Sequence, residues 1–174
     1  MRETSPEFPL HPDSPFALLE PDQRAAWFSY MRLQLRLRYE LNRQLQADHG
    51  ISMADFDVLV ALTSDPDSVL GVSALAAQIG WERSRLSHHV KRMADRGLVA
   101  LAVAESDRRV REVRLAPAGV QVLRDAAPAH IDLVRAMFTS ALEPGELADL
   151  TSALDQVYES VIAHGTLPRP ADHP

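Results

Sequence analysis

The sequence predicts a mainly α-helical domain of the α+β class, in which several helices accompany one small β-hairpin. Two observations lead to this prediction. Apolar residues recur at helical spacing in most segments between residues 21 and 163, and only residues 98–115 show the pattern of two strands around a polar turn. With 174 residues, of which 46% are hydrophobic, the chain can bury one compact core.

The two ends of the chain differ from this central part. Residues 1–20 are predicted to form a flexible extension, because four prolines among the first sixteen residues exclude a helix there. Residues 164–174 are predicted to form a tail. The start has no signal-peptide pattern, no apolar run could span a bilayer, and cysteine is absent. We therefore expect a cytoplasmic protein without membrane contacts, disulfides or thiolate metal sites.

A long first helix is expected over residues 21–48. Pro21 suits the first turn of a helix, and Asp22 is favourable at its positive end. The apolar residues of this segment are too numerous for one narrow stripe, so the helix is expected to bury more than one face.

Three shorter helices are expected next, at residues 53–62, 74–79 and 83–95. Ser52 and Ser73 are expected to cap the first two, because a serine oxygen accepts a hydrogen bond from a free amide of the first turn. Gly97 follows the third, where glycine commonly ends a helix.

The hairpin and two more helices complete the chain. Strands are expected at 98–104 and 110–115, joined by a polar tip, and helices at 118–142 and 146–163. Pro128 should kink the first of these helices or divide it, since proline lacks an amide hydrogen. The last helix should turn one apolar face inward, formed by Leu147, Leu150, Leu154, Val157 and Val161.

The order of short helix, tight turn, second helix and hairpin predicts a winged helix-turn-helix. In the helix at 83–95, Leu86, Val90 and Met93 share an apolar face. The other side should face DNA, since an α-helix fits the major groove. Its predicted DNA contacts are Arg83, Ser84, Arg85, Ser87, His88, Lys91 and Arg92. In the hairpin, Arg108, Arg109 and Arg111 are predicted to contact DNA, with Asp107 orienting a neighbouring arginine.

The distribution of charge supports this prediction, although the net charge is −6. Residues 82–114 contain nine Lys and Arg against five Asp and Glu, which gives +4, so the remainder carries −10. A basic region in an acidic body directs one face toward a polyanion.

Two stretches of sequence resemble the MarR family of transcriptional regulators. The first comprises Val72-Ser73-Ala74-Leu75-Ala76, Leu86-Ser87-His88-His89-Val90-Lys91-Arg92-Met93 and Arg96-Gly97-Leu98-Val99. The second runs from Ser106-Asp107-Arg108-Arg109 to Ala116-Pro117-Ala118-Gly119. The Asp107-x-Arg109 pair matches the wing motif of the family, in which the arginine enters the minor groove. Glu82, the His88-His89 pair and Pro128 depart from the common family pattern.

The resemblance covers residues 21–163 and implies a DNA-binding lobe at 51–117. It also implies that the helices at 21–48 and 118–163 interlock with those of a second subunit. On this basis we expect a homodimer that binds double-stranded DNA at a pseudo-palindromic operator. The family further implies a repressor that a small-molecule effector controls.

Alternative interpretations concern both the function and single residues. A winged helix can also bind another protein in place of DNA. An enzyme is not expected, because the sequence lacks recognisable catalytic motifs. His88 and His89 could suggest a metal site, but His89 is better read as a packed residue, and neither metal nor cofactor is predicted. Four residues could line an effector pocket or serve only packing: Trp27, Tyr30, Met31 and Tyr39.

Overall fold

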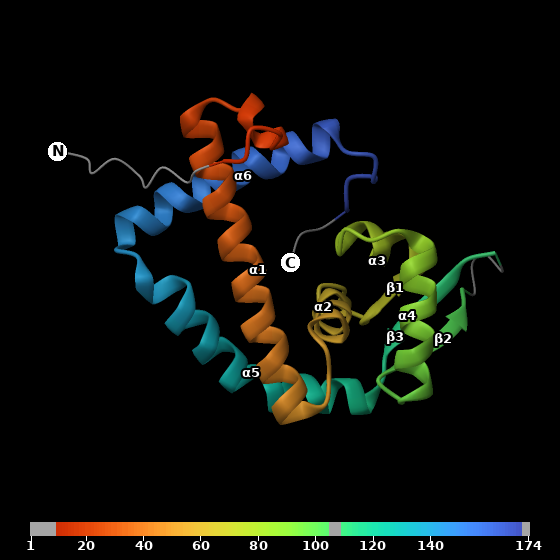
Figure 1. The fold of residues 1–174 in the computed structure, drawn as a ribbon. Helices are drawn as coiled ribbons and strands as arrows, with labels where there is room; N and C mark the ends of the chain where they lie inside the picture. Colours follow the sequence, from red (N-terminus) through yellow and green to blue (C-terminus); the bar gives the residue numbers. More distant parts are fainter. Residues whose placement is uncertain (1–9, 105–108, 172–174) are drawn as a thin grey trace. The chain divides into compact units, whose positions relative to one another are not determined.

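The computed structural model describes residues 10–104 and 109–171, and its chain divides into two units. One unit extends to Glu40 and the second begins at Leu41, so the long helix α1 contributes to both (Figure 1). None of the described helices is both long and apolar enough to cross a membrane.

The N-terminal unit contains a short 3-10 helix and the first two thirds of α1. The 3-10 helix η1 spans Pro15–Leu18, and α1 spans Pro21–His49 with Pro21 in its first turn, as predicted. The ring of Phe16 packs edge-on against that of Phe28, with centroids 5.2 Å apart. Among the described residues, the part of α1 in this unit has no buried side chain, so the expected burial of more than one face is not found there. The apolar side chains that remain exposed are Trp27, Tyr30, Leu33, Leu35 and Tyr39.

In the second unit, the last turns of α1 join the core and lead to α2 (Met53–Leu62). Leu41 and Leu45 are the buried residues of α1. Ser52 caps α2 as predicted: its hydroxyl accepts a hydrogen bond from the Asp55 amide at 3.1 Å, and the Asp55 carboxylate accepts one from the Ser52 amide at 2.9 Å. This reciprocal pair satisfies two backbone donors at the start of the helix.

The helices α3 (Val72–Gln78) and α4 (Arg83–Asp95) form the helix-turn-helix. The predicted cap at Ser73 is wrong, because α3 begins earlier and Gly71 occupies the capping position. Helix α4 has the predicted bounds. Gly97 lies two residues after its end and has a φ of +74°, which favours glycine, and the Leu98 amide donates back to the Met93 carbonyl at 3.0 Å.

A three-stranded antiparallel sheet packs beside these helices. Its strands are β1 (Val69–Gly71), β2 (Val99–Val103) and β3 (Arg111–Leu115), in the order β1-β3-β2. Strand β1 was not predicted, since three residues are too short to show an alternating pattern. In β3, Val113 lies opposite both Leu70 and Leu101 and is fully buried.

The core of the second unit lies between α2, α3, α4 and the sheet. Its largest fully buried side chains are Leu45, Ile51, Leu59, Leu62, Leu75, Leu86 and Met93. The start of α5 approaches this core very closely at Gly119, where an added Cβ would lie only 2.2 Å from the Leu98 carbonyl oxygen. The position therefore has room for glycine alone.

The C-terminal part consists of α5 (Pro117–Met137), the 3-10 helix η2 (Thr139–Ala141) and α6 (Pro144–His164). Pro128 does not divide α5, which stays one helix whose ribbon changes direction along its length (Figure 1). The expectation of an inward apolar face on α6 is wrong for the single chain, since α6 has no buried residue. Val157 and Val161 are 61% and 59% exposed.

Candidate nucleic-acid interface

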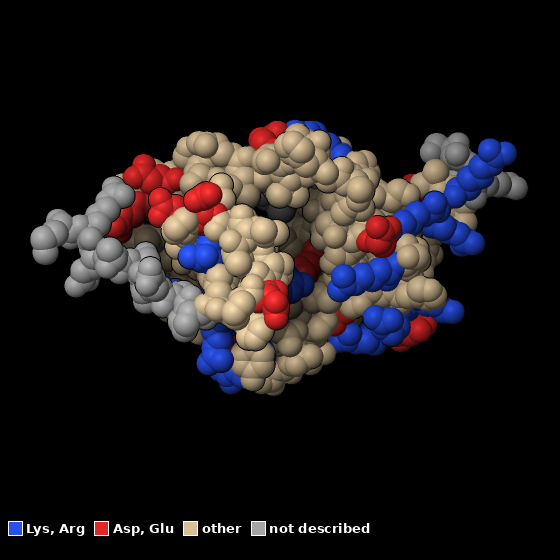
Figure 2. All heavy atoms as spheres, turned by 45° about the horizontal axis from the view of Figure 1, so that its top comes forward, with Lys and Arg blue, Asp and Glu red and all other residues tan. Residues whose placement is uncertain are grey.

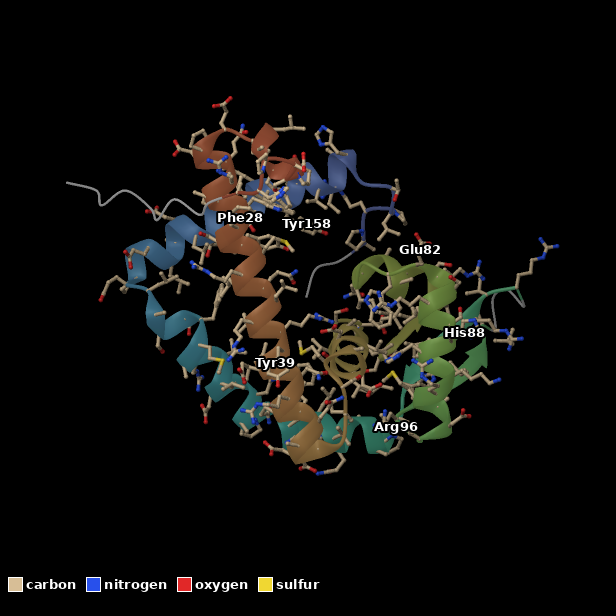
Figure 3. The ribbon with its side chains drawn as sticks, in the orientation of Figure 1. Phe28, Tyr39, Glu82, His88, Arg96 and Tyr158 are labelled. Carbon is tan, nitrogen blue, oxygen red and sulfur yellow. The ribbon has the colours of Figure 1, made fainter. Side chains whose placement is uncertain are left out.

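Helix α4 presents a polar face opposite a buried apolar one. Leu86, Val90 and Met93 are at most 1% exposed, as the helical spacing predicts. All seven predicted contact residues on this helix are exposed, from Arg83 to Arg92. In Figure 3, Glu82 and Arg96 mark the two ends of α4, and His88 lies between them on the side away from α2. The helix therefore has one continuous surface on which a ligand could lie.

The N-terminal end of this surface combines free helix amides with charged side chains. Glu82 is the residue before the first helical position, and its side chain makes no capping hydrogen bond. Arg83 and Ser84 occupy the first turn and are exposed. The Ser87 hydroxyl donates to the Arg83 carbonyl at 2.8 Å. Ser87 thus keeps its oxygen lone pairs for an incoming donor, while its hydroxyl hydrogen is already used.

Two of the α4 cations are held by neighbouring rings. The guanidinium carbon of Arg85 lies 4.1 Å from the centroid of the Trp81 ring, which is a cation–π contact. The Arg92 guanidinium donates to Nδ1 of His89 at 3.0 Å. His89 itself is buried, as predicted for a packed histidine, whereas His88 is exposed.

The hairpin supplies further exposed cations, including Arg109 and Arg111. Arg111 begins β3 and pairs in register with Val103. Because side chains alternate along a strand, Arg111 shares the sheet face of Val113 but lies beyond the buried region. Arg109 is an exposed turn residue just before β3. The predicted roles of Asp107 and Arg108 fall outside the described residues.

These cations gather on one part of the second unit. Figure 2 shows basic side chains gathered over the region that carries α4 and the hairpin, with few acidic side chains among them. Such a surface attracts a polyanion despite the net charge of −6.

A buried carboxylate, which sequence reasoning missed, ties the C-terminal end of α4 to α2. Asp55 is 4% exposed, and its Oδ2 accepts a hydrogen bond from Arg96 at 2.9 Å. Arg96 also donates to the Gly50 carbonyl at 2.8 Å. Nε2 of His89 lies 3.0 Å from Asp55 Oδ1, at an angle short of ideal hydrogen-bond geometry. Asp55 thereby connects α2 with His89 on α4 and with Arg96 at the C-terminal end of α4.

The same contacts control the ionisation of this carboxylate. Burial alone raises the pKa of Asp55, but the close approach of His89 and the hydrogen bonds from the Ser52 backbone and Arg96 outweigh it, so the pKa is well below its usual range. Asp55 is therefore ionised at neutral pH. The signal in the sequence was the spacing Ser52-x-x-Asp55, which identifies a capping carboxylate but not its partners on α4.

The four candidate effector residues of α1 do not converge on one cavity within the N-terminal unit. The rings of Trp27 and Tyr30 contact each other with centroids 5.8 Å apart. Tyr39 lies farther along, with the Arg36 guanidinium 5.8 Å from its ring. Met31 lines a separate apolar cavity of about 360 Å³, together with Leu10, Phe28 and Arg32.

This architecture is similar to that of known proteins. The sequence model described as MarR family matches residues 49–110, which include the helix-turn-helix and most of the hairpin. None of the curated proteins compared with this chain matches it.

Two solved structures from Streptomyces coelicolor are similar over most of their length. Sco3205, a MarR family transcriptional regulator solved in complex with DNA, is 33% identical with a TM-score of 0.81. The alignment covers 87% of this chain and 98% of Sco3205. AbsC, also a MarR family transcriptional regulator, is 32% identical with a TM-score of 0.78, over 82% of this chain and 96% of AbsC. This chain therefore belongs to the MarR family of non-enzymatic, winged helix-turn-helix transcriptional regulators.

Proposed function

We propose that this protein regulates transcription by binding double-stranded DNA, with α4 in the major groove and the hairpin beside it. The observation that carries this proposal is the division of α4 into a buried apolar face and a fully exposed face of cations, serines and a histidine. The dimensions of an α-helix suit the major groove, and arginine is the usual partner of guanine there. The DNA complex of the similar protein Sco3205 supports the same assignment.

We assign different tasks to the two halves of the surface. Arg83, Arg85, Ser87 and His88 lie on the first half of α4, and N-terminal residues of a recognition helix contact base edges. Lys91, Arg92 and the hairpin arginines are proposed to neutralise phosphates or enter the minor groove. Ser84 in the first turn suits a phosphate oxygen.

The functional form is proposed to be a homodimer on a pseudo-palindromic site. The terminal helices support this, because no residue of α6 is buried and the part of α1 in the N-terminal unit keeps large apolar side chains exposed. The exposed apolar side chains of the two helices include Trp27, Tyr30, Leu33, Leu154, Val157 and Val161. Two copies of α4 about 34 Å apart would meet successive major grooves on one side of the duplex.

We further propose that the protein represses transcription and that a small effector controls it. A dimer bound across a promoter excludes polymerase, which transcription in vitro from an operator-containing template tests directly. We place a small, largely apolar effector at the open apolar depression that Met31 lines with Leu10, Phe28 and Arg32. Such an effector would act by favouring a spacing of the two α4 helices that no longer matches the grooves.

The decisive experiment measures the salt dependence of duplex binding by fluorescence anisotropy. Operator sequences are first selected from random DNA, which also reports site symmetry and half-site spacing. Arg109→Ala should weaken binding to all duplexes and reduce the slope of log K against log salt by about 1. Arg124→Ala, on the exposed side of α5, removes the same charge away from the interface and should change neither quantity.

Two outcomes would contradict the proposal. If the wild-type protein binds no duplex at low ionic strength, the protein-binding alternative takes its place. If Arg109→Ala and Arg124→Ala behave alike, the hairpin is not part of the interface. Substitutions of Ser87 and His88 complete the test, because they should alter base preference more than overall affinity.

A further inference from the structure

We propose that Trp81 is a positioning residue for the DNA-binding surface: its indole fixes the direction of Arg85, which reads sequence, and, through His89, that of Arg92, which contacts the DNA backbone. Trp81 does not itself reach the exposed face of α4, where DNA is proposed to bind. The inference rests on the proposed DNA-binding function and adds to it a residue that no contact prediction included.

Trp81 is suited to this task because it is itself immobile. It lies in the turn between α3 and α4, is only 8% exposed and belongs to the core cluster. Its amide donates to the Ala76 carbonyl at 2.8 Å, which fixes the backbone of the turn. Ring and backbone are therefore both held by the second unit before any ligand arrives.

The face of the indole holds Arg85. The guanidinium carbon stands 4.1 Å from the ring centroid, well inside the range of cation–π attraction, for which tryptophan is the best partner. A free arginine side chain samples many rotamers and loses that freedom on binding. An arginine already stacked in one direction loses less, and it presents its donors to one base rather than to several.

The indole also contacts His89. The two ring centroids are 5.2 Å apart with the planes at 80°, an edge-to-face contact. On the other side of the imidazole, the guanidinium of Arg92 is 3.0 Å from Nδ1. Because a guanidinium can only donate, Nδ1 must accept, and the hydrogen of the neutral ring lies on Nε2, next to Asp55 Oδ1. The imidazole is thus held by Trp81, Arg92 and Asp55 together.

This arrangement explains how a core residue can influence base choice. Arg85 is the third residue of α4, in the part of a recognition helix that contacts base edges. Arginine distinguishes guanine only when both of its donors meet the base in one plane. Fixing the guanidinium against the indole sets that plane in the free protein.

The first test uses NMR on the full-length protein without DNA. The ring current above an indole should shift the side-chain Hδ and Hε signals of Arg85 upfield from those of Arg83, an exposed residue of the same turn. Trp81→Leu should return them to the range of Arg83, and Trp81→Phe should keep part of the shift. Wild-type protein with no such shift would overturn the proposal, whatever the variants do.

The second test measures discrimination between duplexes. The base pair that Arg85 reads is identified as the one whose preference Arg85→Ala abolishes. At that pair Trp81→Leu should lower the affinity ratio between preferred and altered duplex about two- to fivefold, the range of a cation–π contact, and Trp81→Phe should retain most of it. Adding Trp81→Leu to Arg85→Ala should cause no further loss of discrimination, since the two act as one unit.

The possible results distinguish a failure of the proposed DNA binding from a failure of the positioning role of Trp81. No duplex binding by the wild type would remove the proposed function and this inference with it. Normal binding with discrimination unchanged in Trp81→Leu would overturn the positioning role alone. A uniform loss of affinity for all duplexes in Trp81→Leu, with the ratio intact, would likewise overturn it, because that is the signature of a purely structural residue. Thermal unfolding of Trp81→Phe confirms that discrimination is compared between folded proteins.

Discussion

The winged helix lobe and the terminal helices use apolar residues in opposite ways. In the lobe, the apolar face of α4 and the inward side of the sheet are buried within the chain, and Leu86, Met93 and Val113 are fully covered. In α6 no residue is buried, and the first half of α1 exposes aromatic rings as well as leucines. Exposed apolar clusters of this kind mark interaction surfaces.

The two regions therefore have different requirements for stability. The lobe contains its own core and ties its helices together through Asp55, so its stability should not depend on protein concentration. The terminal helices need a partner to cover them, so properties that depend on them should follow mass action.

The largest effect is expected inside the lobe, at Asp55. Asp55→Asn should lower the free energy of unfolding by about 3 kcal/mol at pH 7, the lower end of the cost of breaking a buried ion pair, because Arg96 is partly exposed. Urea unfolding at several protein concentrations measures it, and the loss should be the same at each. Asp132→Asn, in the exposed pair with Arg135, is the control and should cost less than about 0.5 kcal/mol.

The pH dependence of this loss has a definite sign. The pKa of Asp55 is lowered in the fold, so the stability contributed by its carboxylate is fully present above the unfolded pKa of about 4. That contribution disappears as the pH falls toward the folded pKa. The difference between wild type and Asp55→Asn should therefore be constant from pH 6 to 8 and shrink in acid. A difference that grew in acid would contradict the assignment.

The next effect concerns the terminal helices. Replacing Val157 and Val161 of α6 together by Asp should convert the proposed dimer to monomers and lower operator affinity on the order of 100-fold, because the second half-site is lost. Light scattering and anisotropy measure the two changes. The control places two carboxylates at the neighbouring positions Gln156 and Ser160 of the same helix and should leave both unchanged. If the double variant stayed dimeric, Val157 and Val161 would not belong to the dimer interface.

A smaller effect is expected where α5 meets the lobe. Gly119→Ala should destabilise the protein by roughly 1–3 kcal/mol, since the new methyl group would meet the Leu98 carbonyl and two leucine side chains. Gly145→Ala in α6 is the matched control: an added Cβ there meets nothing within 4 Å, and alanine favours the helix. Equal melting temperatures for the two variants would mean that the lobe tolerates overpacking at this position.

The smallest effect is expected at the start of α4. Glu82→Gln should strengthen duplex binding about two- to fivefold, because a surface charge interaction is worth at most about 1 kcal/mol. The gain should shrink as salt rises. Asp95→Asn, at the opposite end of the same helix, provides the comparison and should have less influence. Weaker binding by Glu82→Gln would show that this carboxylate serves as an acceptor for a base.

The fold of the lobe was largely predictable from the sequence because its apolar residues are buried within the lobe itself. The bounds of α4 followed from the spacing of Leu86, Val90 and Met93, and the cap at Ser52 from its reciprocal partner. What escaped prediction depends on contacts between residues far apart in sequence. Asp55 meets Arg96 across 41 positions, and β1 acquires strand geometry only by pairing with β3.

The helices at the two ends show a different limit. Periodicity correctly marked the apolar residues of α6, but a pattern cannot tell whether the surface that covers them belongs to the same chain. The same holds for Trp27 and Tyr30 in α1. For Pro128 the sequence left two outcomes open, a kink or a division, and only the division is excluded: losing one amide hydrogen removes one backbone hydrogen bond, and the remaining turns of α5 hold the helix together.

The register of the central strand has a consequence for how such a hairpin can diversify. Val113 pairs with Leu70 on one side and with Leu101 on the other, and the pairing of β2 with β3 continues to Val103 and Arg111. Beyond that pair, the Ala104 amide donates to the Val110 carbonyl at 3.0 Å, and Ala104 is buried. A change in the length of the tip that keeps this last contact would leave the inward side chains in place, so evolution or design can adjust the reach of the hairpin without disturbing the core.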